Sequence, residues 1–111
     1  MGMKNWIAVH TYHSDEIKRK FTGAVPLEDR LTDIQWAEGW RFEKARCRQY
    51  WIGNDDFFFC NWEAESESDI HDALEHRGMS AFCQTACYQI HDHVDANQLM
   101  GALRKHGPWE D

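Results

Sequence analysis

Four short segments of the chain are rich in aromatic and β-branched residues and alternate, in large part, between apolar and polar positions. Such segments, bounded by clusters of Gly, Asn, Asp and Ser, are typical of β-strands. We therefore predict strands over residues 6–13, 41–52, 57–63 and 87–93. Because only the turn cluster at 53–56 separates the second segment from the third, these two strands are expected to form a hairpin.

The segment between the first two strands predicts a helix. Ser14 and the acids that follow it are typical of a helix start, but Gly23 and Pro26 interrupt the region. The main helix is expected from about residue 27 to Gly39. Its apolar positions repeat every three to four residues, which places them on one buried face. They are Leu27, Leu31, Ile34 and Ala37.

A second helix is expected to start near Ser66 and to end at Gly78. Its buried face is predicted to consist of Ile70, Ala73 and Leu74. His71 with Glu75, and Asp72 with His76, are four residues apart. That spacing brings both members of a pair to one helix face, where a surface ion pair is the favoured interpretation and a metal site the other.

The order of elements is strand, helix, strand, strand, helix, strand, followed by a last helix over 95–105 with Leu99, Met100 and Leu103. Two βαβ halves joined by a hairpin predict an α+β, ferredoxin-like βαββαβ fold. Its antiparallel four-stranded sheet would carry both helices on one face. We expect one domain over 1–94 and a C-terminal helical extension over 95–111, which packs on the domain or docks a partner.

Composition agrees with a folded core and excludes two classes of partner. Of the 111 residues, 42% are hydrophobic and 14% aromatic, so enough apolar area exists for one packed domain. The formal net charge of −7 argues against nucleic-acid binding, which needs a basic surface. No apolar run approaches the roughly 20 residues that span a membrane. The chain is therefore expected to be a soluble protein.

The four cysteines are expected to be reduced thiols. No apolar leader precedes them, and Cys83 and Cys87 lack the spacing of a C-x-x-C motif. Cys47 and Cys60 fall in strand patterns, where a thiol behaves as a small hydrophobic side chain. Burial would leave Cys60 chemically inert. These features predict a cytoplasmic location.

Residues 59–64 (Phe-Cys-Asn-Trp-Glu-Ala), followed by the Ser-led segment 66–78 and by Ala81, resemble a family signature. The family consists of small bacterial ferredoxin-like proteins of unknown function and includes a nickel-binding member. Residues 48–51 resemble its second strand less closely. The likeness follows the order of elements over about 5–91. It implies a homodimer formed through sheets or strand edges, and binding of a divalent transition metal, Ni²⁺ or Zn²⁺.

Histidines on the first and last strands are the candidate metal ligands. In the predicted sheet those strands are neighbours, so His10 and His91 would lie side by side on the face away from the helices, with His93 next to them. Asn61 could join them. Imidazole nitrogens suit Ni²⁺, Cu²⁺ and Zn²⁺. The alternative is that His10 lines a dimer interface and that the other two histidines are solvated at a strand end.

A cavity lined by aromatic side chains is the second possibility for a site. Trp6, Trp40, Trp51 and Trp62 could line it, with His10 or Tyr12 assisting proton transfer. Large aromatic residues otherwise form plain core. We expect a dimeric module that binds a metal ion or small ligand, with Tyr12, Asn61 and Trp51 as ligand contacts and no residue assigned as catalytic. The alternative is a dimeric α/β-barrel monooxygenase or isomerase acting on a small aromatic or apolar substrate.

Overall fold

The computed structural model describes residues 2–108 and contains a single antiparallel sheet. The strands lie in the order β2-β3-β1-β4. This order confirms the predicted α+β, ferredoxin-like arrangement, because the two outer strands are the second and the last in the sequence. The strand bounds are β1 (Lys4–Tyr12), β2 (Ala45–Trp51), β3 (Phe57–Ala64) and β4 (Cys83–Ile90).

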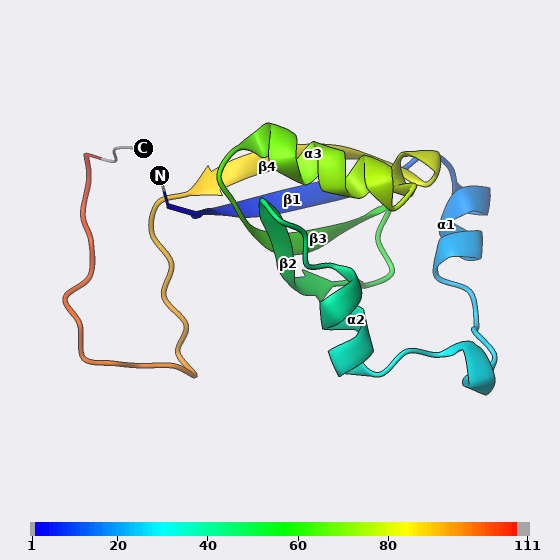
Figure 1. The fold of residues 1–111 in the computed structure, drawn as a ribbon, viewed down its shortest axis with the longest axis horizontal. Helices are drawn as coiled ribbons and strands as arrows, with labels where there is room; N and C mark the ends of the chain where they lie inside the picture. Colours follow the sequence, from blue (N-terminus) through cyan, green and yellow to red (C-terminus); the bar gives the residue numbers. More distant parts are fainter. Residues whose placement is uncertain (1, 109–111) are drawn as a thin grey trace.

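The second βαβ half is closed by one regular helix, α3 (Glu67–His76), which lies along one face of the sheet (Figure 1). Ile70, Ala73 and Leu74 are buried beneath it, as predicted. Gly78 follows the helix with a φ of 72°, a left-handed conformation that glycine adopts without strain. A 3₁₀ turn, η2 (Met79–Ala81), then leads directly into β4.

The first βαβ half has no comparable helix. Its connection consists of α1 (Asp15–Phe21), the 3₁₀ turn η1 (Leu27–Asp29) and α2 (Asp33–Gly39). The predicted continuous helix from 27 to 39 is therefore wrong. A capping box at Thr32 starts α2, because the Thr32 hydroxyl accepts from the Gln35 amide while the Gln35 side chain accepts from the Thr32 amide.

The predicted buried face of that helix is also wrong. Leu27, Leu31 and Ile34 are exposed. The residues that face the sheet are instead Trp36 of α2 and Trp40, the C-cap of α2, four positions apart. Trp36 packs edge-on against Tyr50 of β2, and Trp40 packs edge-on against Trp62 of β3. The aromatic spacing, rather than the leucine spacing, marks the inward face of α2.

The last strand begins four residues earlier than predicted. β4 pairs with β1 from Cys83, opposite Tyr12, to Ile90, opposite Asn5. Because β1 begins at Lys4, little partner strand remains for residues beyond 90. The chain leaves the sheet there.

The predicted helix over 95–105 does not form. Residues 91–108 contain no helix and run away from the sheet on the side of the N-terminus (Figure 1). The side chain of Leu103 is 98% exposed, and Leu99 and Met100 are exposed as well. A short helix with no surface to pack on is marginal in water, which accounts for the difference. No helix within residues 2–108 is long and apolar enough to cross a membrane.

The core lies between the sheet and the helices. Alternate residues of β1, namely Trp6, Ala8, His10 and Tyr12, point into it and are buried. All four cysteines are free thiols, as predicted, and Cys47 and Cys60 are buried in the core. His10 is thus a core residue on the helix side, whereas the sequence placed it on the opposite face of the sheet.

Candidate functional site

A hollow of about 290 Å³ lies between the sheet, the broken first connection, and Leu74 and Met79 of α3 and η2. Its volume is at the lower end of the range for small-molecule pockets. Half-exposed side chains of Tyr50 and Ile52 take part in its lining, so it reaches the surface beside β2. We call it the aromatic pocket. The wall residues used below are His10, Phe21, Trp36, Trp40, Phe58 and Trp62.

His10 is the polar centre of the aromatic pocket. Its side chain is fully buried and stacks on Phe58, with ring centroids 4.5 Å apart. Its Nδ1 lies 2.7 Å from the hydroxyl oxygen of Thr85 on the neighbouring strand. Its Nε2 has no hydrogen-bond partner among residues 2–108. Burial, and then the nearby His71, lower the pKa of His10 from 6.5 to about 4, so the imidazole is neutral at pH 7.

In the described part of the chain, two further buried side-chain polar atoms on the same side of the sheet lack partners. They are the hydroxyl of Tyr12 and the indole Nε1 of Trp62. Trp62 lines the aromatic pocket, while the Tyr12 ring packs against Phe21 and Phe58, which line it. Burial, and then Cys83, raise the pKa of Tyr12, so its hydroxyl stays protonated and able to donate. Buried polar groups are nearly always hydrogen-bonded, and each unpaired one costs about 1–3 kcal/mol.

Asn61 and Trp51, the other two predicted ligand contacts, lie on the opposite face of the sheet. Asn61 alternates with Cys60 and Trp62, and its side-chain amide donates to the Trp6 carbonyl at 3.0 Å. Trp51 pairs in register with Phe59, which also faces away from the helices. Asn61 therefore has a structural bond, and neither residue reaches the aromatic pocket.

The predicted histidine cluster is not assembled. His10 lies opposite Thr85 in the middle of the sheet, whereas His91 follows the end of β4, beside Asn5. His93 lies farther along the extended C-terminal segment, in a separate surface hollow that His91 also lines. Within residues 2–108, no three His, Cys, Asp or Glu side chains are grouped to hold a metal ion. The expectation that His10 and His91 are neighbours is wrong because of the register: His10 pairs with Thr85, whereas Ile90, the residue before His91, pairs with Asn5 at the other end of β1.

The thiol and histidine near α3 do not form a nucleophilic pair. Cys87 Sγ lies 4.0 Å from His71 Nε2, and the same nitrogen lies 3.3 Å from Glu67. Because both contacts use one ring nitrogen, His71 cannot relay a proton between them. Burial, and then the Glu67 charge, raise the pKa of Cys87 to about 12, which keeps the thiol protonated.

The surface pairs predicted on α3 are also different from those observed. His71 contacts Glu67, one turn earlier in the helix, rather than Glu75. His76 packs edge-on against Phe42, with centroids 5.9 Å apart, rather than pairing with Asp72. The first contact lies within α3, and the second joins the helix to the segment before β2.

Several residues of the site were missed in the sequence. Thr85 lies before the predicted last strand. The strand pattern that places Thr85 on the same face as Cys83 and Cys87 was therefore not recognised. Phe21 and Trp36 belong to short helices whose apolar residues are too few to show a period. The four-residue spacing of the tryptophans at 36 and 40 was the one sequence signal that could have identified the inward face of this helix.

Searches with protein-family models, among curated proteins and among solved structures found no match for this chain. The resemblance of residues 59–78 to the nickel-binding family therefore stays a prediction.

Proposed function

We propose that the chain binds a small, mostly apolar aromatic molecule in the aromatic pocket, and that His10 anchors a polar group of that molecule. The observation that carries this proposal is the unpartnered, fully buried Nε2 of His10 beside a hollow of about 290 Å³. A ligand hydroxyl or carbonyl would supply the missing hydrogen bond. Its aromatic ring would contact the walls formed by Trp36, Trp40 and Phe58.

A neutral imidazole suits this role. It presents one donor and one acceptor nitrogen, and the Thr85 hydroxyl can take either part toward Nδ1. Nε2 therefore accepts from a ligand hydroxyl in one tautomer and donates to a ligand carbonyl in the other. A charged imidazolium would instead demand a counter-ion, and the pocket walls are largely apolar.

Calorimetric titration with 2-naphthol tests the proposal, with naphthalene as the matched ligand that lacks the hydroxyl. The variant His10→Asn keeps an amide near the position of Nδ1, where it can bond Thr85, but has no atom at Nε2. It should weaken 2-naphthol binding about tenfold and leave naphthalene binding unchanged. The proposal fails if the wild-type protein does not bind 2-naphthol, or if His10→Asn binds it equally well.

The same geometry supports a second candidate function, proton transfer on a bound ketone. In the tautomer whose Nδ1–H donates to Thr85, Nε2 holds a lone pair that can take a proton from an acidic C–H bond. The electrons of the broken C–H bond would remain on the substrate as an enolate, and Nε2, after exchanging its proton with solvent, would return a proton to carbon as in an isomerase. Deuterium uptake at C1 of 2-tetralone, followed by NMR in D₂O, tests this. A rate no higher than that of buffer, or one kept by His10→Asn, excludes it.

We further propose that two copies pair through the outer face of the sheet, the face opposite α3. Apolar side chains gather on it, and large exposed apolar patches mark interaction sites. Ile7 and Val9 lie at its centre, and the half-exposed rings of Trp51, Phe57, Phe59 and Tyr88 surround them. Pairing would cover these rings without blocking the aromatic pocket on the other face.

A further inference from the structure

A second hollow, of about 230 Å³, lies at the outer edge of β2 beside α2. Its polar lining comes from Arg41, Arg46 and Arg48, and its apolar lining from Trp36, Ala37 and Cys47. We call it the arginine groove. No acidic side chain from residues 2–108 lines it, although the protein as a whole carries a formal charge of −7. Three guanidinium groups are thus gathered at one place on a protein that is acidic overall.

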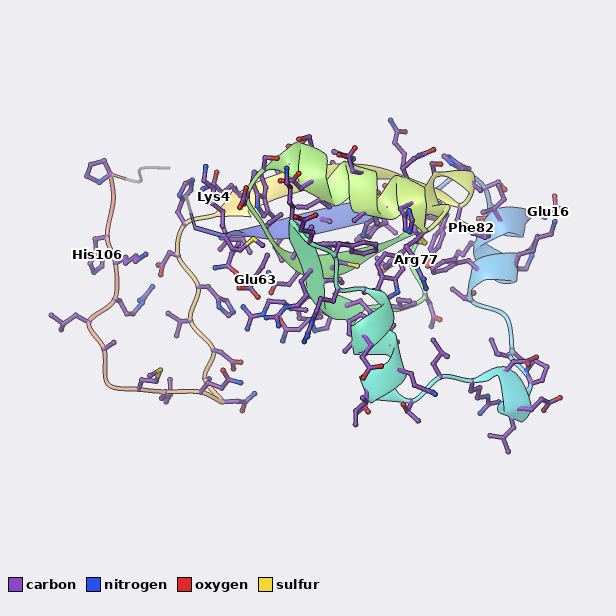
Figure 2. The ribbon with its side chains drawn as sticks, in the orientation of Figure 1. Lys4, Glu16, Glu63, Arg77, Phe82 and His106 are labelled. Atoms are coloured by element: carbon purple, nitrogen blue, oxygen red, sulfur yellow. The ribbon has the colours of Figure 1, made fainter. Side chains whose placement is uncertain are left out.

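The positive charge of the arginine groove is only partly compensated. Glu63 projects from β3 on the side of the sheet opposite α3 (Figure 2), where it contacts Arg46 and lies 3.6 Å from Arg48 Nε. The single carboxylate of Glu63 thus balances only one of the two positive charges beside it. The side chain of Arg41 is exposed and forms no ion pair with any residue between 2 and 108. The groove therefore keeps an excess of positive charge.

The arginine groove adjoins the aromatic pocket. Trp36 and Cys47 line both hollows, so one wall separates them. Trp36 belongs to α2, whose side chains are not fully buried, and its ring rests edge-on against the half-exposed Tyr50. A substituent that leaves the pocket past Trp36 would arrive among the arginines.

We propose that the ligand of the aromatic pocket is an aromatic carboxylate, and that its carboxylate is held in the arginine groove by Arg41 and Arg48. This inference rests on the proposed function. Guanidinium groups match a carboxylate with two parallel N–H donors, which makes arginine the preferred side chain for this recognition. The ligand class is then a planar aromatic acid with a second polar group, set apart from the acid, that reaches His10 Nε2.

Two probes that differ only in the carboxylate test this inference by calorimetry: 6-hydroxy-2-naphthoate and 2-naphthol. The wild-type protein should bind the naphthoate about tenfold more tightly than the naphthol. Arg41→Gln should remove most of that preference, whereas Arg41→Lys should keep part of it. Because the groove is open to solvent, the preference should shrink as salt rises from about 0.05 to about 0.5 M.

Arg19→Gln is the matched control, since it removes the same charge from an exposed position on α1, away from both hollows. It should leave the preference unchanged. Unaltered 2-naphthol binding by Arg41→Gln shows that the variant is folded. If the naphthoate binds no more tightly than the naphthol, or if Arg41→Gln keeps the preference, the arginine groove is not the carboxylate site and the aromatic pocket still stands. If neither probe binds, both proposals fail.

Discussion

A single helix of ten residues covers the sheet in the second βαβ half of the domain, whereas three short helical pieces take the same place in the first half. The second half buries its apolar stripe completely. Beside the first connection the aromatic pocket stays open, with Leu74 of α3 and Met79 of η2 as part of its far wall and polar atoms without partners around it. One sheet thus supports a packed half that stabilises the fold and an open half suited to binding.

The difference begins with local sequence. In α3, the residues at 70, 73 and 74 give a narrow apolar stripe that is buried in one core cluster with small strand residues such as Ala64. In α2 and at its C-cap, the inward residues are two tryptophans, whose rings meet Tyr50 and Trp62 edge-on. Bulky rings at a short helix leave gaps that aliphatic side chains at a long helix would fill.

The comparison is tested most strongly by truncating one isoleucine in each half. Ile70 of α3 is 0% exposed, whereas Ile34 of α2 is 68% exposed. Ile70→Ala should lower the free energy of unfolding by about 3 kcal/mol, because it removes buried methyl groups and leaves a cavity. Ile34→Ala should change it by less than about 0.5 kcal/mol. Urea denaturation at one fixed protein concentration measures both, and equal losses would contradict the comparison.

The outer face of the sheet is expected to respond to charge as an interface does. Phe59→Glu places a carboxylate next to Val9 at the centre of that face. It should weaken dimerisation roughly 100-fold, since an unpaired charge would be buried between the two copies. Leu27→Glu, at an exposed position on η1, is the control. Sedimentation equilibrium gives the dissociation constants, and a wild-type monomer or an unaffected Phe59→Glu dimer would refute the pairing.

The buried imidazole of the open half should make stability depend on pH. The pKa of His10 is about 4 in the folded protein and near 6.5 in the unfolded chain, so the unfolded state binds more protons between those values. Stability is therefore lost as pH falls. Between pH 7 and pH 5 this contribution amounts to about 2 kcal/mol. Denaturation of wild-type and His10→Asn proteins at both pH values measures it, and an equal pH dependence of the two would show that His10 is not buried in its neutral form.

The smallest effect is expected from the C-terminal segment. Deleting residues 95–111 should change the free energy of unfolding by less than about 0.5 kcal/mol, because Leu99, Met100 and Leu103 are exposed and bury nothing. Binding of 2-naphthol should also be unchanged. A large loss of either would mean that this segment packs against the domain.

The fold could be predicted from the sequence where local pattern and packing agree. The alternating strand pattern and the apolar stripe that begins at Ile70 predicted the topology correctly, because the strands and α3 each bury one face. The site was only partly predictable. His10 and Tyr12 were identified, but which face of β1 the helices cover, and which residues of the neighbouring strands lie opposite, depend on the packing and the register of the sheet. Register is set by partner strands that a single segment does not reveal, which is why His91, Asn61 and Trp51 were placed wrongly beside them.

The first connection shows a second limit. Leu27, Leu31 and Ile34 follow a helical period, yet the capping box at Thr32 starts the helix too late to use it. Local hydrogen bonds at the cap decided the boundary, and the two tryptophans decided the inward face. A helical pattern that contains only three or four apolar residues is too weak to outweigh such local signals.

The central claim is that a ligand occupies the aromatic pocket and bonds His10. An NMR titration of protein with ¹⁵N-labelled imidazoles, using 2-naphthol as the ligand, tests this most directly. The Nε2 resonance of His10 should shift on saturation, while that of His93, in the extended C-terminal segment, should not. An unchanged His10 resonance at saturating 2-naphthol would contradict the account.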